Sequence, residues 1–289
     1  MDHPAEAPAR SGGPSVSPTR LTGRGRFGAA CAGLGGGFLS GVLGGGGGAV
    51  MVPLMTGPLR MAQHVAHGTS LLVIAATAMV AAMAYAAHDA PDPALVAALG
   101  SGAIAGASLG ARGAARVPAL QLRLLFGVFL VAVSLRMLLW ESADPLFDAS
   151  GTLRWGAALA VGLAGGVASG ALGVGGGSIF VPALVLLLGT SQHEAQGISL
   201  WVILLASVSG GITHYRQGTV QMDSARWMVP AALPAAVAGA FVATALSGRS
   251  LQMVFAVVLA AIGTQMAWTA RRRMRPGPIE RVPLAADAA

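Results

Sequence analysis

Long uncharged runs dominate the pattern of hydrophobic and polar positions along the chain. Residues 61–87 contain no Asp, Glu, Arg or Lys, and neither do residues 156–192. Each run is longer than the roughly 20 apolar residues that a helix needs to cross a bilayer. The pattern therefore predicts an all-α polytopic membrane protein. We expect its apolar segments near residues 27–57, 67–87, 94–111, 119–140, 154–188, 197–214, 225–246 and 250–269.

The two halves of the chain repeat one another at an offset of 129 residues. Residues 40–53 and 169–182 are identical at nine of fourteen positions, and residues 63–71 and 192–200 at six of nine. This repeat predicts two four-helix halves whose first helices are broken by glycine. The expected divisions are a disordered cytosolic N-terminus, a first repeat, an acidic linker, a second repeat and a basic cytosolic tail: 1–26, 27–140, 141–153, 154–270 and 271–289.

The number of membrane crossings in each half decides how the two repeats are oriented. Four crossings in each half would start both halves on the same side of the membrane. We expect this parallel arrangement, about an axis along the membrane normal. If the glycine break instead makes the first segment re-enter and leave on its own side, each half has an odd number of crossings, and the repeats are inverted.

Arginine supplies all of the fixed positive side-chain charge, because the chain contains no lysine. The arginines gather at the termini and in short loops rather than on a soluble face, which argues against a nucleic-acid partner. The positive-inside rule then predicts that the protein spans a bacterial inner membrane with both termini in the cytoplasm. In the parallel arrangement, five arginines fall at or near the outside: Arg60, Arg112, Arg116, Arg123 and Arg249.

Glycine runs interrupt the first apolar segment of each half. Consecutive glycines weaken a helix by about 1 kcal/mol each relative to alanine. They do not lie along one helix face, as the close-packing glycines Gly33, Gly37 and Gly41 do. A nucleotide-binding loop is disfavoured, because no acidic residue follows about 20 residues later and no Gly-Lys-Ser/Thr is present.

We expect a broken helix at each run, whose second piece begins with exposed N–H groups that can bind an anion. A re-entrant turn that only fills space is the alternative. The glycines expected to contact substrate are Gly44, Gly46, Gly47, Gly48, Gly173, Gly175, Gly176 and Gly177.

Polar residues before and at the start of the following segment are the other candidates for substrate contacts. Serine and threonine hydroxyls there would either cap the helix or donate to substrate oxygens. Histidines would either pack, bind an anion or carry a proton. These candidates are Thr69, Ser70, Ser199, His64 and His193. Every Asp and Glu lies at a terminus or in a predicted loop, so coupling through a mid-span carboxylate is not expected.

The pattern S-G-x-L-G-x-G-G-G-x-x-x-V-P, followed by Q-H-x-A-x-G-x-S-L and present in both halves, resembles the TauE/SafE family of sulfite-exporter-like permeases. The resemblance covers nearly all of residues 27–270 and includes His214-Tyr215 followed by Gly218. The first half departs from this landmark, with Tyr85-Ala86-Ala87-His88. The resemblance implies transport of small organosulfur compounds or sulfur oxyanions, such as sulfonates or sulfite.

We therefore expect a permease of about eight transmembrane helices, with a small anionic substrate and the lipid bilayer as its partners. No catalytic residue, metal or cofactor is expected, and Cys31 as the only cysteine excludes a multi-cysteine metal site. The alternatives are an intramembrane enzyme and a non-transporting accessory subunit. An enzyme would need a nucleophile with a base, and no carboxylate completes such a set with His64, His67 and Ser70. The sequence leaves oligomeric state, direction and energy source open.

Overall fold

The computed structural model describes residues 22–113, 119–139 and 151–274, and all regular structure in these ranges is helical. The helices are α1 Gly23–Leu43, α2 Gly48–Thr56, α3 Gln63–Ala86, α4 Pro93–Gly113, α5 Ala119–Leu139, α6 Thr152–Leu172, α7 Gly177–Leu188, α8 Gln192–Arg216, α9 Met222–Ala245 and α10 Gly248–Met274. The expected all-α fold is therefore confirmed for the described residues. Helices α1 and α10 extend a few residues into the segments assigned to the two tails.

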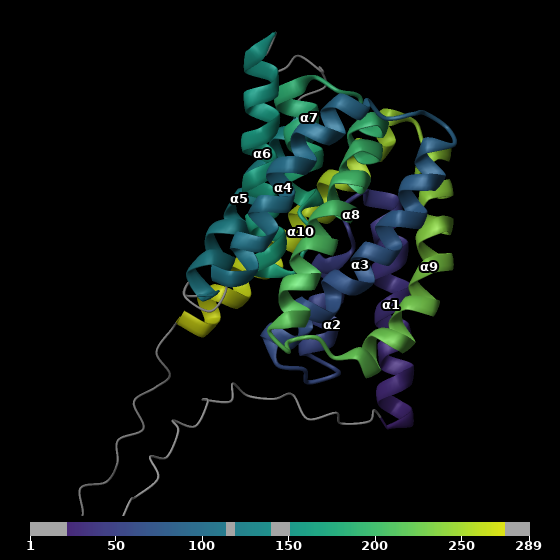
Figure 1. The fold of residues 1–289 in the computed structure, drawn as a ribbon, viewed down its shortest axis with the longest axis vertical. Coiled ribbons are helices and arrows are strands. Elements are labelled where there is room, and N and C mark those ends of the chain that lie inside the picture. Colours follow the sequence, from purple (N-terminus) through teal and green to yellow (C-terminus); the bar gives the residue numbers. More distant parts are fainter. Residues whose placement is uncertain (1–21, 114–118, 140–150, 275–289) are drawn as a thin grey trace, which may run out of the picture.

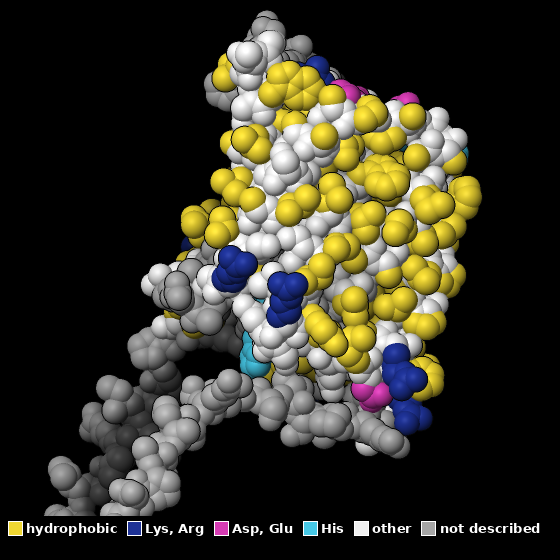
Figure 2. All heavy atoms as spheres, viewed as in Figure 1, with side chains coloured by type: hydrophobic (Ala, Val, Ile, Leu, Met, Phe, Trp, Pro, Cys, Tyr) yellow, Lys and Arg dark blue, Asp and Glu magenta, His cyan; other side chains and the backbone are white. Residues whose placement is uncertain are grey.

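Six described helices are long and apolar enough to cross a membrane: α3, α4, α6, α8, α9 and α10. Large hydrophobic side chains also cover the outside of the molecule, as Leu125 (70% exposed) and Met83 (60% exposed) illustrate. Figure 2 shows this apolar surface across one face, whose visible acidic side chains lie near its two ends. Such an outer surface suits contact with lipid.

The first apolar segment of each half is broken at its glycines, and the second piece turns back along the first. Gly36 of α1 lies against Met51 of α2, and Gly28 lies against Leu59, just beyond α2. Since the partner number on α1 falls as the chain advances, α2 runs antiparallel to α1. Helices α6 and α7 turn back in the same way (Figure 1). With nine and twelve residues, α2 and α7 are too short to cross the roughly 30 Å hydrocarbon core.

The two halves are inverted with respect to one another. Helices α3 and α8 are equivalent in the repeat, yet Gly68 lies beside His214 while Tyr85 hydrogen-bonds Gln196, so the two helices run antiparallel. The expected parallel relation is therefore wrong. The physical reason is the turn at the glycines, which returns the first segment to its own side and removes one crossing from each half.

Glycine ridges join the two halves. Gly33, Gly37 and Gly41 of α1 lie so close to the α9 backbone that a Cβ on any of them would overlap a carbonyl oxygen of that helix. Gly162, Gly166 and Gly170 of α6 pack against the α4 backbone in the same manner. These contacts confirm that the spaced glycines serve close helix packing. The first helix of each half therefore packs against a helix of the other half: α1 against α9, and α6 against α4.

Candidate functional site

The two glycine breaks meet between α3 and α8. A Cβ built on Gly46 would lie 3.3 Å from the Cα of Gly175, and one on Gly177 would overlap the Cα of Gly45. Ile74 of α3 and Ile203 of α8, which are equivalent in the repeat, both border Gly46. The glycine runs of the two halves are thus brought together, and a side chain at Gly177 would overlap the opposite backbone.

Backbone conformation explains which positions of each run must be glycine. Gly46 and Gly47 have φ values of 80° and 63°, in the region that favours glycine, and Gly175 and Gly176 repeat this with 91° and 81°. Gly45 has no positive φ, and its equivalent in the second half is Val174. The sequence difference between the two runs therefore follows their backbone geometry.

The candidate hydroxyls hold the glycine breaks in place. Ser70 Oγ donates to the Gly173 carbonyl oxygen at 2.9 Å, and Ser199 Oγ donates to the Gly44 carbonyl oxygen at 2.9 Å. Thr69 Oγ1 accepts from the backbone N–H of Gln221 at 2.9 Å. All three side chains are buried. These hydrogen bonds go to the backbone of the opposite half, and Ser70 Oγ also lies 2.8 Å from the carbonyl oxygen of His67 in its own helix. None of the three side chains lines the two cavities described below.

The two candidate histidines lie at opposite ends of the molecule, because they begin the antiparallel helices α3 and α8. His64 is exposed. His193 Nε2 lies 3.1 Å from the carbonyl oxygen of Leu246 and 3.3 Å from that of Ala243, at the end of α9. The structure does not bring His64 and His193 together.

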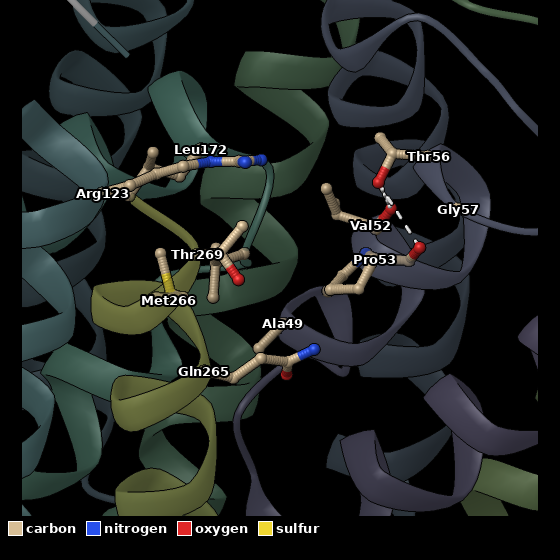
Figure 3. Close-up of a pocket in the computed structure, with 12 residues that line it drawn as sticks. Ala49, Val52, Pro53, Thr56, Gly57, Arg123, Leu172, Gln265, Met266 and Thr269 are labelled. Atoms are coloured by element: carbon tan, nitrogen blue, oxygen red, sulfur yellow. Dashed lines mark hydrogen bonds between the residues drawn. The ribbon is translucent and has the colours of Figure 1, made fainter. Parts of the chain in front are cut away.

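A cavity of about 180 Å³ lies beside the first break, between α2 and the helices α5, α6 and α10. Figure 3 shows Arg123 extending from α5 toward the space between α2 and α10. Gly48 and Ala49 line the cavity at the start of α2, where the first helix-bonded N–H belongs to Val50, so the amides of these two residues precede the helix ladder. The remaining lining residues are Val52, Pro53, Thr56, Gly57, Leu172, Val174, Gln265, Met266 and Thr269.

The cavity combines groups that suit an anion. Arg123 carries a permanent positive charge and five N–H donors. Gln265 and Thr269 add amide and hydroxyl groups from α10, and the N-terminus of α2 adds the positive end of a helix dipole. With the Gln63 amide oxygen facing Arg123, that oxygen accepts from Nη2 at 2.8 Å and from Nε at 3.2 Å. These groups converge from four separate helices.

A second cavity of about 280 Å³ lies at the opposite end of the molecule, and Tyr85, His88, His193, Glu194 and Gly197 are among its lining residues. Gly197 is not tightly packed, since the nearest Tyr85 atom would lie 3.9 Å from a Cβ built there. Its equivalent at the other end, Gly68, is tightly packed, because a Cβ there would lie 2.5 Å from the Thr219 carbonyl oxygen. The two ends of the α3–α8 pair are therefore not packed alike.

A family model described as sulfite exporter TauE/SafE matches residues 29–213 and 158–288, which together span most of the chain. The chain belongs to the TauE/SafE family. This membership confirms the resemblance seen in the repeated glycine motifs. Together with the apolar helices, it makes the chain a multi-pass protein of a membrane transporter family.

Curated relatives of this TauE/SafE chain carry transporter names. "Probable membrane transporter protein YunE" of Bacillus subtilis (strain 168) is 29% identical over 257 residues, covering 80% of this chain and 93% of the relative. A "Probable membrane transporter protein" of Xylella fastidiosa (strain 9a5c) is 29% identical over 241 residues, covering 80% and 91%. No solved structure shows a significant match to the chain.

Sequence reasoning missed the polar lining of the TauE/SafE cavity, because Arg123 was assigned to the outer end of a segment. The repeat contains a signal that would have found it. At the offset of 129, Arg123 is equivalent to Gln252, and Arg136 is equivalent to Gln265. Polar residues therefore recur at the same two positions of the apolar α5–α10 pair, which lipid exposure would not favour.

Proposed function

We propose that this chain is a permease that moves a small anion, a sulfur oxyanion or an organosulfonate, across a bacterial inner membrane. The cavity at Arg123 is the observation that carries the proposal. A guanidinium group binds planar oxyanion edges through paired N–H donors. The start of α2 and the amide and hydroxyl of Gln265 and Thr269 supply further donors for a substrate with several oxygens.

The inverted fold supports six full crossings rather than the expected eight: α3, α4 and α5 in the first half and α8, α9 and α10 in the second. The pairs α1–α2 and α6–α7 each turn back at a glycine break. Arg60 follows Leu59, which packs near the start of α1. Antiparallel packing brings the starts of α3 and α5 and the ends of α4, α8 and α10 to this same end. Arginines at this end of the described chain are Arg24, Arg26, Arg60, Arg112, Arg123, Arg216, Arg226, Arg271 and Arg272, against Arg136, Arg154 and Arg249 toward the other.

This distribution favours cytoplasmic termini by the positive-inside rule. Among the described residues the inverted arrangement increases the bias slightly, because Arg60, Arg112 and Arg123 move to the side of the termini while only Arg136 and Arg154 move away from it. The Arg123 cavity then lies toward the cytoplasmic half of the protein.

Reconstitution tests the proposal and separates it from the two alternatives. The purified protein, without any added subunit, should move radiolabelled sulfite or ethanesulfonate into proteoliposomes and leave the solute chemically unchanged. Chloride serves as the comparison anion outside the proposed substrate class. Chemical conversion of the solute would support an intramembrane enzyme. Failure to move any of these anions would contradict the proposal and favour an accessory role.

A further inference from the structure

Equivalent polar positions of α3 and α8 carry different chemistry at the two ends of the molecule. The offset of 129 makes Tyr85 equivalent to His214 and Gln196 equivalent to His67. Tyr85 Oη hydrogen-bonds Gln196 Oε1 and lies 3.3 Å from the Gly41 carbonyl oxygen. His214 Nε2 lies 3.1 Å from the carbonyl oxygen of Gly170, the equivalent of Gly41. One end of the α3–α8 pair therefore carries a tyrosine and a glutamine, where the other end carries two histidines, and each repeat contributes one residue to each pair.

His214 has a hydrogen-bonding environment that accommodates both of its charge states. The Gly170 carbonyl only accepts, so Nε2 carries a hydrogen. Nδ1 lies 2.8 Å from Thr219 Oγ1, which in turn lies 3.0 Å from the backbone carbonyl oxygen of His214. In the neutral ring, the threonine hydroxyl donates to Nδ1. In the imidazolium, Nδ1 donates to Thr219, whose hydroxyl then donates to the carbonyl.

His67, on the neighbouring helix α3, lies beside the same end of α6 as His214. A Cβ built on Gly173 would lie 2.7 Å from the Cα of His67, and the imidazole faces the Ala171 backbone. Both histidines are almost fully buried, at 6% and 2% exposure. Both imidazole side chains therefore face the last turn of α6, where the carbonyl end of the helix dipole stabilises a positive charge.

The end of α6 connects this histidine pair to the anion cavity. Leu172 and Val174 line the cavity, and they flank Gly173 directly. On the other side, Arg123 hydrogen-bonds Gln63, which precedes His67 by one helical turn and shares its face of α3. His64, on α3, is a further titratable group whose charge acts on both histidines.

Electrostatics then links the two sites. The positive charge of Arg123 opposes a second positive charge on His67, because like charges repel. An anion beside Arg123 offsets that repulsion and makes the imidazolium less costly. Binding of the anion and of a proton therefore favour one another, and by linkage the effect is reciprocal.

We propose that His67 and His214 form the proton-binding site that couples anion movement to proton movement in the same direction. The proposal rests on the permease function above. The described carboxylates, Asp89, Asp92, Glu194 and Asp223, all lie in loops or first helical turns. Among the buried side chains of the described spans, these two histidines are the ones whose ordinary pKa lies near neutral pH. A tyrosine and a glutamine at the equivalent site do not exchange protons near neutral pH.

The repeat itself supplies the test variant. His67→Gln together with His214→Tyr copies the Gln196 and Tyr85 pair that the fold already accommodates at the other end. An inward pH gradient, acidic outside, should drive wild-type proteoliposomes to accumulate ethanesulfonate several-fold above the equilibrium level. The double variant should lose that accumulation while keeping downhill ethanesulfonate flux. His88→Gln, an exposed histidine at the opposite end of α3, is the matched control and should accumulate as wild type does.

A transport-independent readout separates this proposal from the permease proposal. Nitrogen-15 histidine NMR spectra of the full-length protein in nanodiscs are recorded with ethanesulfonate present. Under these conditions His67 or His214, assigned by the loss of its signal in single His→Gln variants, should gain a proton between about pH 8 and pH 5, because the bound anion offsets the positive charge of Arg123. Neutral rings throughout that range would overturn the proposal even if transport is observed. Undiminished gradient-driven accumulation by the double variant would overturn it as well.

Discussion

The hydroxyl of Ser70 on α3 donates a hydrogen bond of 2.9 Å to the carbonyl oxygen of Gly173, the residue at which α6 ends. The same bond recurs between Ser199 and Gly44, also at 2.9 Å. Each bond crosses from one repeat to the other. The two halves therefore fix one another's helix break, and the breaks depend on the assembly of both repeats.

Removing these hydroxyls should destabilise the protein. Ser70→Ala or Ser199→Ala leaves a buried carbonyl without its donor, which costs about 1–3 kcal/mol. The melting temperature in detergent should fall for each variant and fall further for the pair. Ser101→Ala is the control, because this exposed serine bonds only to the carbonyl of Ala98 within its own helix. Unchanged melting temperatures in both variants would show that the bonds contribute nothing.

Glycine positions within one run should differ in their tolerance of a side chain. Gly47 has a φ of 63°, and a Cβ there would overlap the carbonyl oxygen of Gly36, so Gly47→Val should prevent accumulation of folded protein. Gly45→Val should be tolerated, since a Cβ there lies no closer than 3.7 Å to the Leu43 side chain and valine is native at the equivalent position. Size-exclusion profiles of fluorescent fusions measure both. Equal yields would contradict the assigned backbone geometry.

Labelling of introduced cysteines distinguishes the inverted from the parallel arrangement. In a Cys31→Ala background, Arg60→Cys should be shielded from a membrane-impermeant thiol reagent in intact spheroplasts, because Arg60 lies on the side of the termini. Asp89→Cys, between α3 and α4, should be labelled. The parallel arrangement requires the reverse labelling pattern at both positions. Comparing the labelling of the two cysteine variants on one gel therefore distinguishes the inverted from the parallel arrangement.

Hydrophobic patterning and the internal repeat were enough to predict the all-α fold and the position of the helix breaks. They were not enough to predict the direction in which α2 leaves the break. A segment of about 30 apolar residues either crosses the membrane or turns back. The choice is made by tertiary contacts, such as Met51 packing against Gly36, that no local pattern encodes.

The candidate site was predicted only in part for a related reason. Gly48 lines the cavity at Arg123, whereas Ser70 and Ser199 hydrogen-bond to backbone carbonyls. Arg123 was assigned to the outer end of a segment because its place depends on the inverted topology. A single wrong orientation therefore concealed the only arginine among the residues that line this cavity.

Uptake kinetics of Arg123→Gln test the central claim most directly. The measurement is the concentration dependence of sulfite and ethanesulfonate uptake by the purified protein in proteoliposomes, with Arg112→Gln as the control at the same end of the molecule. A charge-assisted hydrogen bond contributes about 1.5–3 kcal/mol. Because 1.4 kcal/mol corresponds to a tenfold change, the KM of Arg123→Gln should rise by at least about tenfold. Arg123→Lys, which keeps the charge, should retain part of the affinity. A KM for Arg123→Gln equal to that of Arg112→Gln and wild type would contradict the account.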